Sequence, residues 1–414
     1  MGSDQTLDRF LISKQSLRRK KVSSLKASAR IALLSLVVTT TFGTMMAAPA
    51  LKPLAVAFPN TDALLVQWVV TISSLFILPT LFLSGTLGRR FNRKSILITG
   101  LVLYLIGGVG PAFMHSFDLI LVCRAILGLS IGLISPTFNS LIAENFQGEA
   151  RSRMNGIQTS INGIGGAIFL SIGGFIASLG WRDVFMTYFY AIVLLILVIA
   201  FLPKFPPLQT GQSAKSSAKL PKFFIAVAIA GGLHTMMFAL IPTNLSLFIA
   251  NNGIGSVSSA GYLIAFSLVG VFIGGLSVTR VTKAYKKTLV PLVLILMGGG
   301  FLLLSSAHAV WTVALAVFMI GLTEGVLFPL SFIKTSEVVP TIIVTTGISL
   351  LLACVYTCQF LSPLFVKGVE ALLRSDSTRD VFTAVAVGLA AVAVGFLLFS
   401  RNKMRATFPS ATNN

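Results

Sequence analysis

Long apolar runs dominate the chain and constrain its fold more than any other feature. Of 414 residues, 55% are hydrophobic and 11% are charged. Soluble domains carry about 25% charged residues. Twelve runs are each long enough to cross ~30 Å of hydrocarbon: 31–57, 64–86, 95–114, 118–142, 155–179, 184–203, 223–250, 258–280, 288–307, 309–333, 341–366 and 381–400. Because the alternation of membrane β-strands is absent, the sequence predicts an all-α integral membrane protein with twelve transmembrane helices.

The basic residues are distributed unevenly about these runs. The net charge is +20, and in a twelve-helix topology 26 of the 32 Lys and Arg residues fall on one side. Such a bias marks the cytoplasmic side of a membrane protein. We therefore expect a multi-pass protein of the cell membrane with both termini cytoplasmic. Its basic clusters are expected to meet anionic lipid headgroups, and no nucleic-acid partner is expected.

The polar segments suggest how the chain is divided. Residues 1–30 form a basic tail that is too long and polar for a cleavable signal peptide. Residues 204–222, rich in Pro, Ser and Lys, predict a cytoplasmic linker between six-helix units at 31–203 and 223–400, and 401–414 form a second cytoplasmic tail. A weak repeat at an offset of 190 residues links Gly85, Arg90 and Arg93 with Gly275, Arg280 and Lys283.

Glu324 is the one carboxylate well inside a predicted span. A charge at mid-bilayer costs roughly 2.5–3.5 kcal/mol on insertion scales, so such residues usually face an internal cavity. An acid can avoid that cost by taking up a proton, which suggests proton coupling. His234 lies near the middle of its span and could share protons with Glu324. The alternatives are a permanently protonated Glu324, a Glu324 that binds a cationic substrate, and a hydrogen-bonded structural His234.

The segment GTLGRRFNRK, Gly85–Lys94, resembles the signature between helices two and three of the major facilitator superfamily. The matching positions are Gly85, Leu87, Gly88, Arg90, Arg93 and Lys94, whereas Arg89 and Asn92 replace the family's Asp and Gly. The resemblance implies a cytoplasmic gating motif, with glycines that let helices close on one another. Asn is the next-best residue to Gly at a left-handed position. Either Glu144 or Glu149 substitutes for the missing acid, or the cytoplasmic latch that the resemblance implies is weaker here.

Two further helices carry family signatures. CRAILG, Cys123–Gly128, resembles that of helix four, which implies a role for Arg124 in proton transfer or gating. The alternative is an Arg that bonds carbonyl groups of the first span. In helix five, Gly156, Gly165, Gly173 and Gly174 match the exporter signature, but Phe169 and Leu170 replace its central Gly-Pro. Such glycine spacing also fits ordinary close helix packing.

The resemblance implies two pseudo-symmetric six-helix bundles around a central cavity. It implies that spans one, four, seven and ten line this cavity, with two, five, eight and eleven beside them. The residues expected to contact substrate are the polar and Met side chains of these spans: Thr41, Met45, Asn139, Gln158, Asn162, Met237, Tyr356 and Gln359.

These observations predict a secondary transporter that works by alternating access, with proton-coupled efflux of small amphipathic compounds or drugs as the expected activity. A proton symporter or uniporter for a small metabolite is the first alternative, and a non-transporting membrane sensor or scaffold is the second. No nucleotide-binding, nucleophile or metal-ligand motif is present in the sequence, so we expect no enzymatic activity and no cofactor beyond a proton gradient. The expected partners are a small-molecule substrate, protons and lipid, and the expected state is a monomer.

Overall fold

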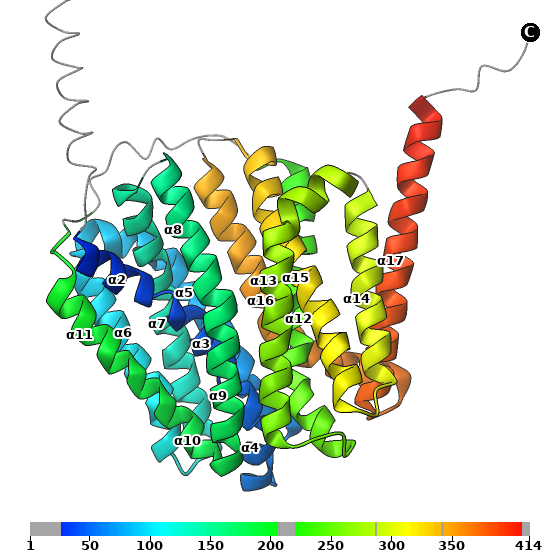
Figure 1. Ribbon diagram of the computed structural model, residues 1–414, viewed down its shortest axis with the longest axis horizontal. Coiled ribbons are helices and arrows are strands. Elements are labelled where there is room, and N and C mark those ends of the chain that lie inside the picture. The colour runs from blue at the N-terminus through cyan, green and yellow to red at the C-terminus, as the bar shows by residue number, and fades with distance from the viewer. Residues whose placement is uncertain are drawn as a thin grey trace, which may run out of the picture.

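The protein is a bundle of apolar helices that stand side by side (Figure 1). The computed structural model describes residues 26–407 except 147, 206, 208–219, 286–287 and 341–342, and these residues contain helices and no strands. The N-terminal half runs α2 (Ala27–Ser35), α3 (Val38–Met45), η1 (Ala48–Ala50), α4 (Leu51–Ala57), α5 (Ala63–Arg90), α6 (Arg93–Val109), η2 (Gly110–Phe113), α7 (Phe117–Asn145), α8 (Gly148–Ser160), η3 (Ile161–Gly165), α9 (Gly166–Leu179), α10 (Trp181–Met186), η4 (Thr187–Phe189) and α11 (Tyr190–Phe201). The C-terminal half comprises α12 (Lys222–Asn251), α13 (Val257–Tyr285), α14 (Leu289–Ser305), α15 (Val310–Val338), α16 (Val344–Leu373) and α17 (Thr378–Thr407).

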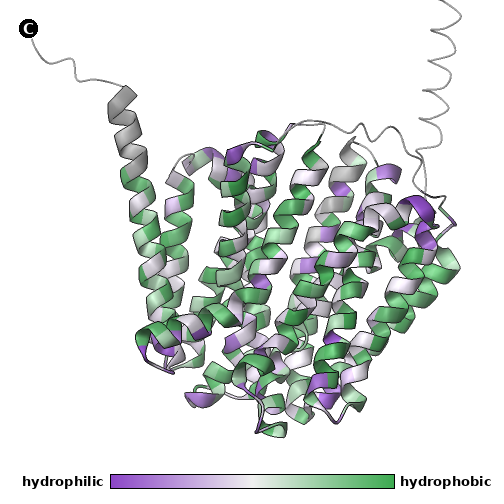
Figure 2. Cartoon of the chain, turned by 180° about the vertical axis from the view of Figure 1, so that it is seen from behind, coloured by the Kyte–Doolittle hydropathy of each residue, from purple (hydrophilic) through white to green (hydrophobic). Residues whose placement is uncertain are grey.

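The predicted helical membrane fold is confirmed. Among the described residues, eleven helices are long and apolar enough to cross a bilayer, and the shorter apolar α14 occupies the ninth predicted span. Figure 2 shows hydrophobic residues along the helices and hydrophilic residues gathered toward their ends. Most of the predicted tails and linker lies outside the described residues, so the domain boundaries stay a prediction.

The first span is divided into the four pieces α2, α3, η1 and α4. Near its first break, Thr39 donates a hydrogen bond to the Leu36 carbonyl at 2.6 Å and Thr40 donates to Val37 at 2.9 Å. Such side-chain bonds compete with the backbone ladder. Pro49 begins the next turn, where its missing N–H group is tolerated. The first span is therefore a succession of short helical pieces, and Ala27–Ala57 is still long and apolar enough to cross a membrane.

The two halves pack their helices in the same way. A Cβ atom on Gly128 of α7 would lie 2.2 Å from the Ser73 carbonyl oxygen of α5, and one on Gly321 of α15 would lie 2.0 Å from that of Ser267 on α13. Both glycines therefore let a helix backbone touch its neighbour. The two are 193 residues apart, which supports the internal repeat at an offset close to that of the motif residues.

The bundles meet away from the face at which α17 ends. We call the latter the terminal face and the other the opposite face (Figure 1). The hydrogen bonds that the described residues make between bundles lie in the half toward the opposite face and are called the opposite-face contacts: Lys52–Asn251, Gln67–Asn244, Ser74–Gln359, Ser246–Pro49 and Lys367–Asp62. Gly174 of α9 also touches α13 here, since its Cβ would lie 2.6 Å from the Gly261 Cα.

Asp62 has two roles at this face. Its carboxylate accepts hydrogen bonds from the Lys367 ammonium at 2.8 Å and from the backbone N–H of Leu64 at 2.7 Å, so it also caps the start of α5. The Lys367 ammonium, and then the Leu64 N–H group, hold the pKa of Asp62 below its ordinary value.

Candidate substrate and proton site

Glu324 and His234 lie together in the interior of the C-terminal half. Glu324 is near the middle of α15 and His234 near the middle of α12, and the Oε2–Nδ1 distance is 2.9 Å. Their side chains are 8% and 5% exposed. Thr235 of α12 lies 3.5 Å from the other carboxylate oxygen and also donates to the Gly231 carbonyl at 3.0 Å. The structure thus brings the two predicted titratable groups into contact.

The contact is close but not aligned as a hydrogen bond. Neither ring nitrogen of His234 makes a directed hydrogen bond to a described residue, and the same holds for Oε2 of Glu324. We therefore describe the pair as a close polar contact, which a small rotation of either side chain would turn into a hydrogen bond. The alternative of a structural histidine requires a hydrogen bond from His234, and its ring nitrogens make none to a described residue.

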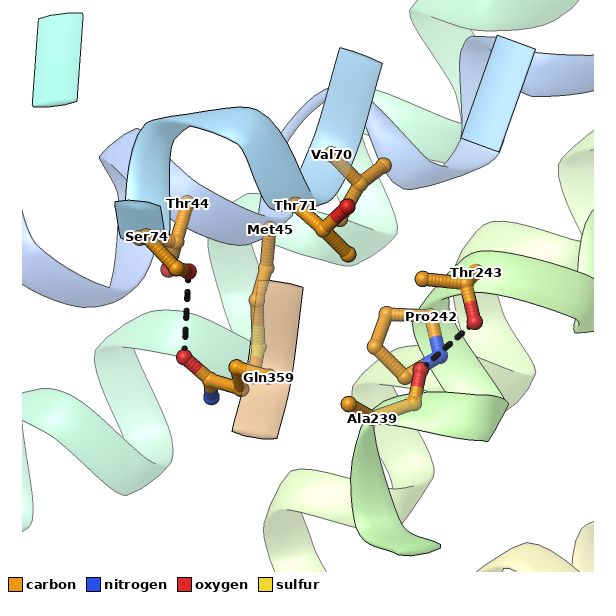
Figure 3. A pocket seen from close by; sticks show the side chains of 9 residues that line it. All are labelled: Thr44, Met45, Val70, Thr71, Ser74, Ala239, Pro242, Thr243 and Gln359. Atoms are coloured by element: carbon orange, nitrogen blue, oxygen red, sulfur yellow. Dashed lines mark hydrogen bonds between the residues drawn. The ribbon is translucent and has the colours of Figure 1, made fainter. Parts of the chain in front are cut away.

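A small pocket lies between the bundles, beside the opposite-face contacts (Figure 3). It is lined by residues of the first span, α5, α12 and α16: Thr44, Met45, Val70, Thr71, Ser74, Ala239, Pro242, Thr243 and Gln359. Ser74 donates to the Gln359 amide oxygen across the pocket at 3.1 Å. The Thr71 hydroxyl is buried and makes no hydrogen bond to a described residue. The lining combines hydroxyl and amide groups with apolar surface and contains no charged side chain.

The predicted cavity residues are divided between this pocket and other places. Met45 and Gln359 line the pocket. The others pair or pack elsewhere: Thr41 donates to Asn162 at 3.1 Å, Gln158 donates to Asn139 at 2.8 Å in an exposed position, and Met237 and Tyr356 pack in or against the apolar core.

Sequence reasoning missed Thr71 and Ser74 of α5 and Thr243 of α12. Thr71 and Ser74 are three residues apart, so they share a face of one helix. That spacing could have marked α5 as a lining helix.

Arg124 is wholly buried within the N-terminal half. Its guanidinium donates to the Val69 carbonyl at 2.7 Å, the Gly43 carbonyl at 2.9 Å and the Tyr188 hydroxyl at 2.9 Å. It thereby joins α7 to α3, α5 and η4. The Gly43 bond matches the predicted alternative of an arginine that bonds carbonyl groups of the first span. A role in proton transfer stays a prediction.

Two basic residues of the Gly85–Lys94 motif have clear partners, but the expectation of a left-handed Asn92 is wrong. Arg93 forms an ion pair with Glu144, as expected for the substitute acid, and Lys94 donates to the Ile199 carbonyl at 2.7 Å. Gly85 is exposed and a Cβ there would meet no described atom within 4 Å, so its expected role in helix closure stays a prediction. Asn92 is not left-handed: its φ is −62°, and its side chain caps α6 by accepting from the Lys94 N–H.

The remaining motif residues differ in exposure. Gly88 is buried in α5, Arg89 and Arg90 are exposed, and Leu87 is half-buried. The side chain of Glu149, the other expected acid, lies outside the described residues.

The fifth span contains a π-helical turn. This turn, η3, lies between α8 and α9 and includes Asn162. Of the four signature glycines, Gly174 meets the α13 backbone, and a Cβ on Gly173 would lie 2.6 Å from the Met46 methyl group. A Cβ on Gly156 would meet nothing within 4 Å, and one on Gly165 only a methyl group at 3.7 Å. Of these four signature glycines, only Gly173 and Gly174 are closely packed.

Comparison with known proteins gives a family across most of the chain. A family model described as Major Facilitator Superfamily matches residues 33–363. The chain is 30% identical over 141 residues to an arabinose-proton symporter of Escherichia coli, a match that covers 34% of this chain and 30% of that protein. It is 27% identical over 187 residues to a major facilitator superfamily multidrug transporter of Aspergillus fumigatus, over 43% and 36% of the two chains. The matches thus span about a third of these relatives' length.

Solved structures show the same fold over nearly the full length. A bacterial homologue of the human lysosomal transporter Spinster, in an inward-facing and unoccupied conformation, superposes with a TM-score of 0.72. The superposition covers 94% of this chain and 100% of that one, at 15% sequence identity.

Proposed function

Because this chain belongs to the major facilitator superfamily of membrane transporters, we propose that it exports small amphipathic compounds in exchange for protons. The observation that carries the proposal is the buried contact between Glu324 and His234. A carboxylate and an imidazole in contact can hold one proton more or one fewer as their surroundings change. One proton that moves across 100 mV is worth about 2.3 kcal/mol, which sustains roughly a 40-fold substrate gradient.

The charge distribution supports an orientation and a conformation. The positive-inside bias puts the terminal face in the cytoplasm. The opposite-face contacts, which join the bundles at the outer side, then correspond to an inward-facing state. In this state we expect the interior to exchange protons and substrate with the cytoplasm.

The pocket lining supports an amphipathic substrate. Met45, Val70 and Pro242 offer apolar contact, while Thr71 and Gln359 offer hydrogen bonds. Glu324 does not belong to the lining, so the proton and the substrate are proposed to occupy different positions. Coupling would then act through α12, which carries both His234 and pocket residues.

Proton-driven uptake of a small polar metabolite is the second candidate. The similarity to the arabinose-proton symporter and the hydroxyl-rich lining favour it. The replacement of the exporter Gly-Pro by Phe169 and Leu170 points the same way.

Transport in proteoliposomes tests the proposal and separates the two candidates. With an acidic lumen, an antiporter accumulates ethidium inside the vesicles, whereas a symporter accumulates its substrate only when the outside is acidic. Glu324→Gln is expected to abolish accumulation driven by the pH gradient. Glu337→Gln is the matched control, because Glu337 lies on the same helix as an exposed partner of Lys334. If Glu324→Gln transported as fast as the wild type under a pH gradient, the proposed role of Glu324 would be refuted.

A further inference from the structure

Cys354 and Cys358 present their sulfur atoms to a single point of the neighbouring helix. They lie one turn apart on α16, and both are free and half-buried. A Cβ atom on Gly232 of α12 would lie 2.9 Å from the Sγ of Cys354 and 2.8 Å from that of Cys358. The two sulfurs can therefore be no farther apart than 5.7 Å, the sum of these distances.

The third cysteine has a different environment. Cys123 is buried against Gly110, with its Sγ 2.8 Å from a Cβ placed there, and no second thiol shares that contact among the described residues. Packing accounts for Cys123. At Gly232, by contrast, the thiols of Cys354 and Cys358 both approach the same point of α12, where the glycine has no side chain.

We propose that Cys354 and Cys358 form a two-thiol binding site for soft, thiophilic species, of which trivalent arsenicals are the class that two thiols suit best. Soft thiolate ligands select soft ions. No further His, Cys, Asp or Glu completes a metal-binding group in the described part of the chain, which argues against a four-ligand zinc site. With an arsenic(III) oxide, two As–S bonds form, and the oxygen leaves as water with the two thiol protons. Arsenic stays trivalent, so no oxidant is needed.

Occupation of this site would affect α16, a helix of the C-terminal half that also contacts the N-terminal half. Gln359, next to Cys358, bonds Ser74 of the other bundle and lines the pocket. On the α12 side, Gly232 is two residues from His234. The bridge links two residues of α16 at the point where they pack against Gly232 of α12. We expect the added group to disturb this helix contact and to stop transport. This part rests on the proposed transport function, whereas binding itself does not.

The test uses phenylarsine oxide with the purified full-length protein. Intact-mass spectrometry should find one phenylarsenic group per wild-type chain, retained through a wash with 2-mercaptoethanol and released by 2,3-dimercaptopropanol. Cys354→Ala and Cys358→Ala should each bind about 10²–10⁴-fold more weakly, because the second bond is then no longer intramolecular. Cys123→Ala is the control and should bind like the wild type. Equal retention by either single variant, or release of the wild-type adduct by the monothiol, would overturn the site.

Transport measured on the same samples tests the consequence. Phenylarsine oxide should stop wild-type transport, the dithiol should restore it, and both single variants should transport undisturbed. Stable binding with unchanged wild-type transport would overturn the arrest and leave the site standing. If no substrate moves in any sample, the proposed transport activity fails, while the mass measurement still decides the site.

Discussion

Gly174→Ala is the substitution with the most clearly defined steric consequence. The added Cβ would lie 2.6 Å from the Gly261 Cα and 3.0 Å from the Ser258 carbonyl oxygen. These are backbone atoms of α13, so no side chain can rotate away. Overpacking of this kind costs about 1–3 kcal/mol. The contact joins the two bundles in the half toward the opposite face, so the cost falls on the conformation that is closed there. We expect that conformation to lose about 5- to 140-fold in population relative to one open at this face.

A buried reporter at the same face measures this shift. Ser246 is 2% exposed and donates to the Pro49 carbonyl across the bundle boundary at 3.1 Å. In a protein whose native cysteines are replaced, Ser246→Cys should react slowly with a membrane-impermeant maleimide. Adding Gly174→Ala should speed labelling by the factor given above, as long as closing is faster than labelling.

Gly156→Ala is the matched control on the same span, because a Cβ there meets nothing within 4 Å. It should leave the labelling rate unchanged. The reasoning about this contact is refuted if Gly174→Ala labels no faster than the parent while it remains folded.

Three other predictions concern stability and pH. Asp62→Asn should keep the α5 cap, since Asn caps almost as well as Asp, and lose an exposed ion pair worth about 0.2–1 kcal/mol, which a small rise in Ser246→Cys labelling would report. Because the pKa of Asp62 is lowered, its stabilising effect is present above the unfolded pKa and is lost only as pH falls through the folded value, so labelling should not vary between about pH 5 and 8 through this group. Arg124→Gln should reduce thermal stability in detergent by about 1.5–3 kcal/mol or more, since a hydrogen bond to a charged group contributes that much and three are affected; an unchanged melting temperature would contradict the structural role. Gly128→Ala and Gly321→Ala should lower folded yield to a similar extent in gel-filtration profiles, because both meet a backbone carbonyl oxygen; a loss in only one would argue against equivalent packing.

The positions of the spans could be predicted because hydrocarbon thickness sets the length of an apolar run. The partnership of Glu324 with His234 could be expected for a related reason, since each is a rare titratable group at mid-span. Both predictions depend only on how deep a residue lies in the membrane, and its position within an apolar run indicates that depth.

The contacts between helices depend on which faces of the helices meet, and the depth of a residue in the membrane does not determine this. Ser74 and Gln359 are 285 residues apart and come from different bundles, so no local pattern marks their contact. Asn92 was expected to be left-handed because a family glycine stands there, yet its side chain serves as a helix cap instead. Gly85 matches its signature, yet a Cβ there would meet no described atom within 4 Å.

The π turn at Ile161–Gly165 changes how the fifth span should be compared with its relatives. A turn that takes in one extra residue rotates everything beyond it by about 100° relative to a continuous α-helix. The helix faces before and after the turn are thus out of phase. Counting residues between Gly156 and Gly174 does not tell whether the two point the same way. Removing one residue within the turn would rotate all of α9, including Gly173 and Gly174, relative to the helix before the turn. A substitution within the turn would change only one side chain.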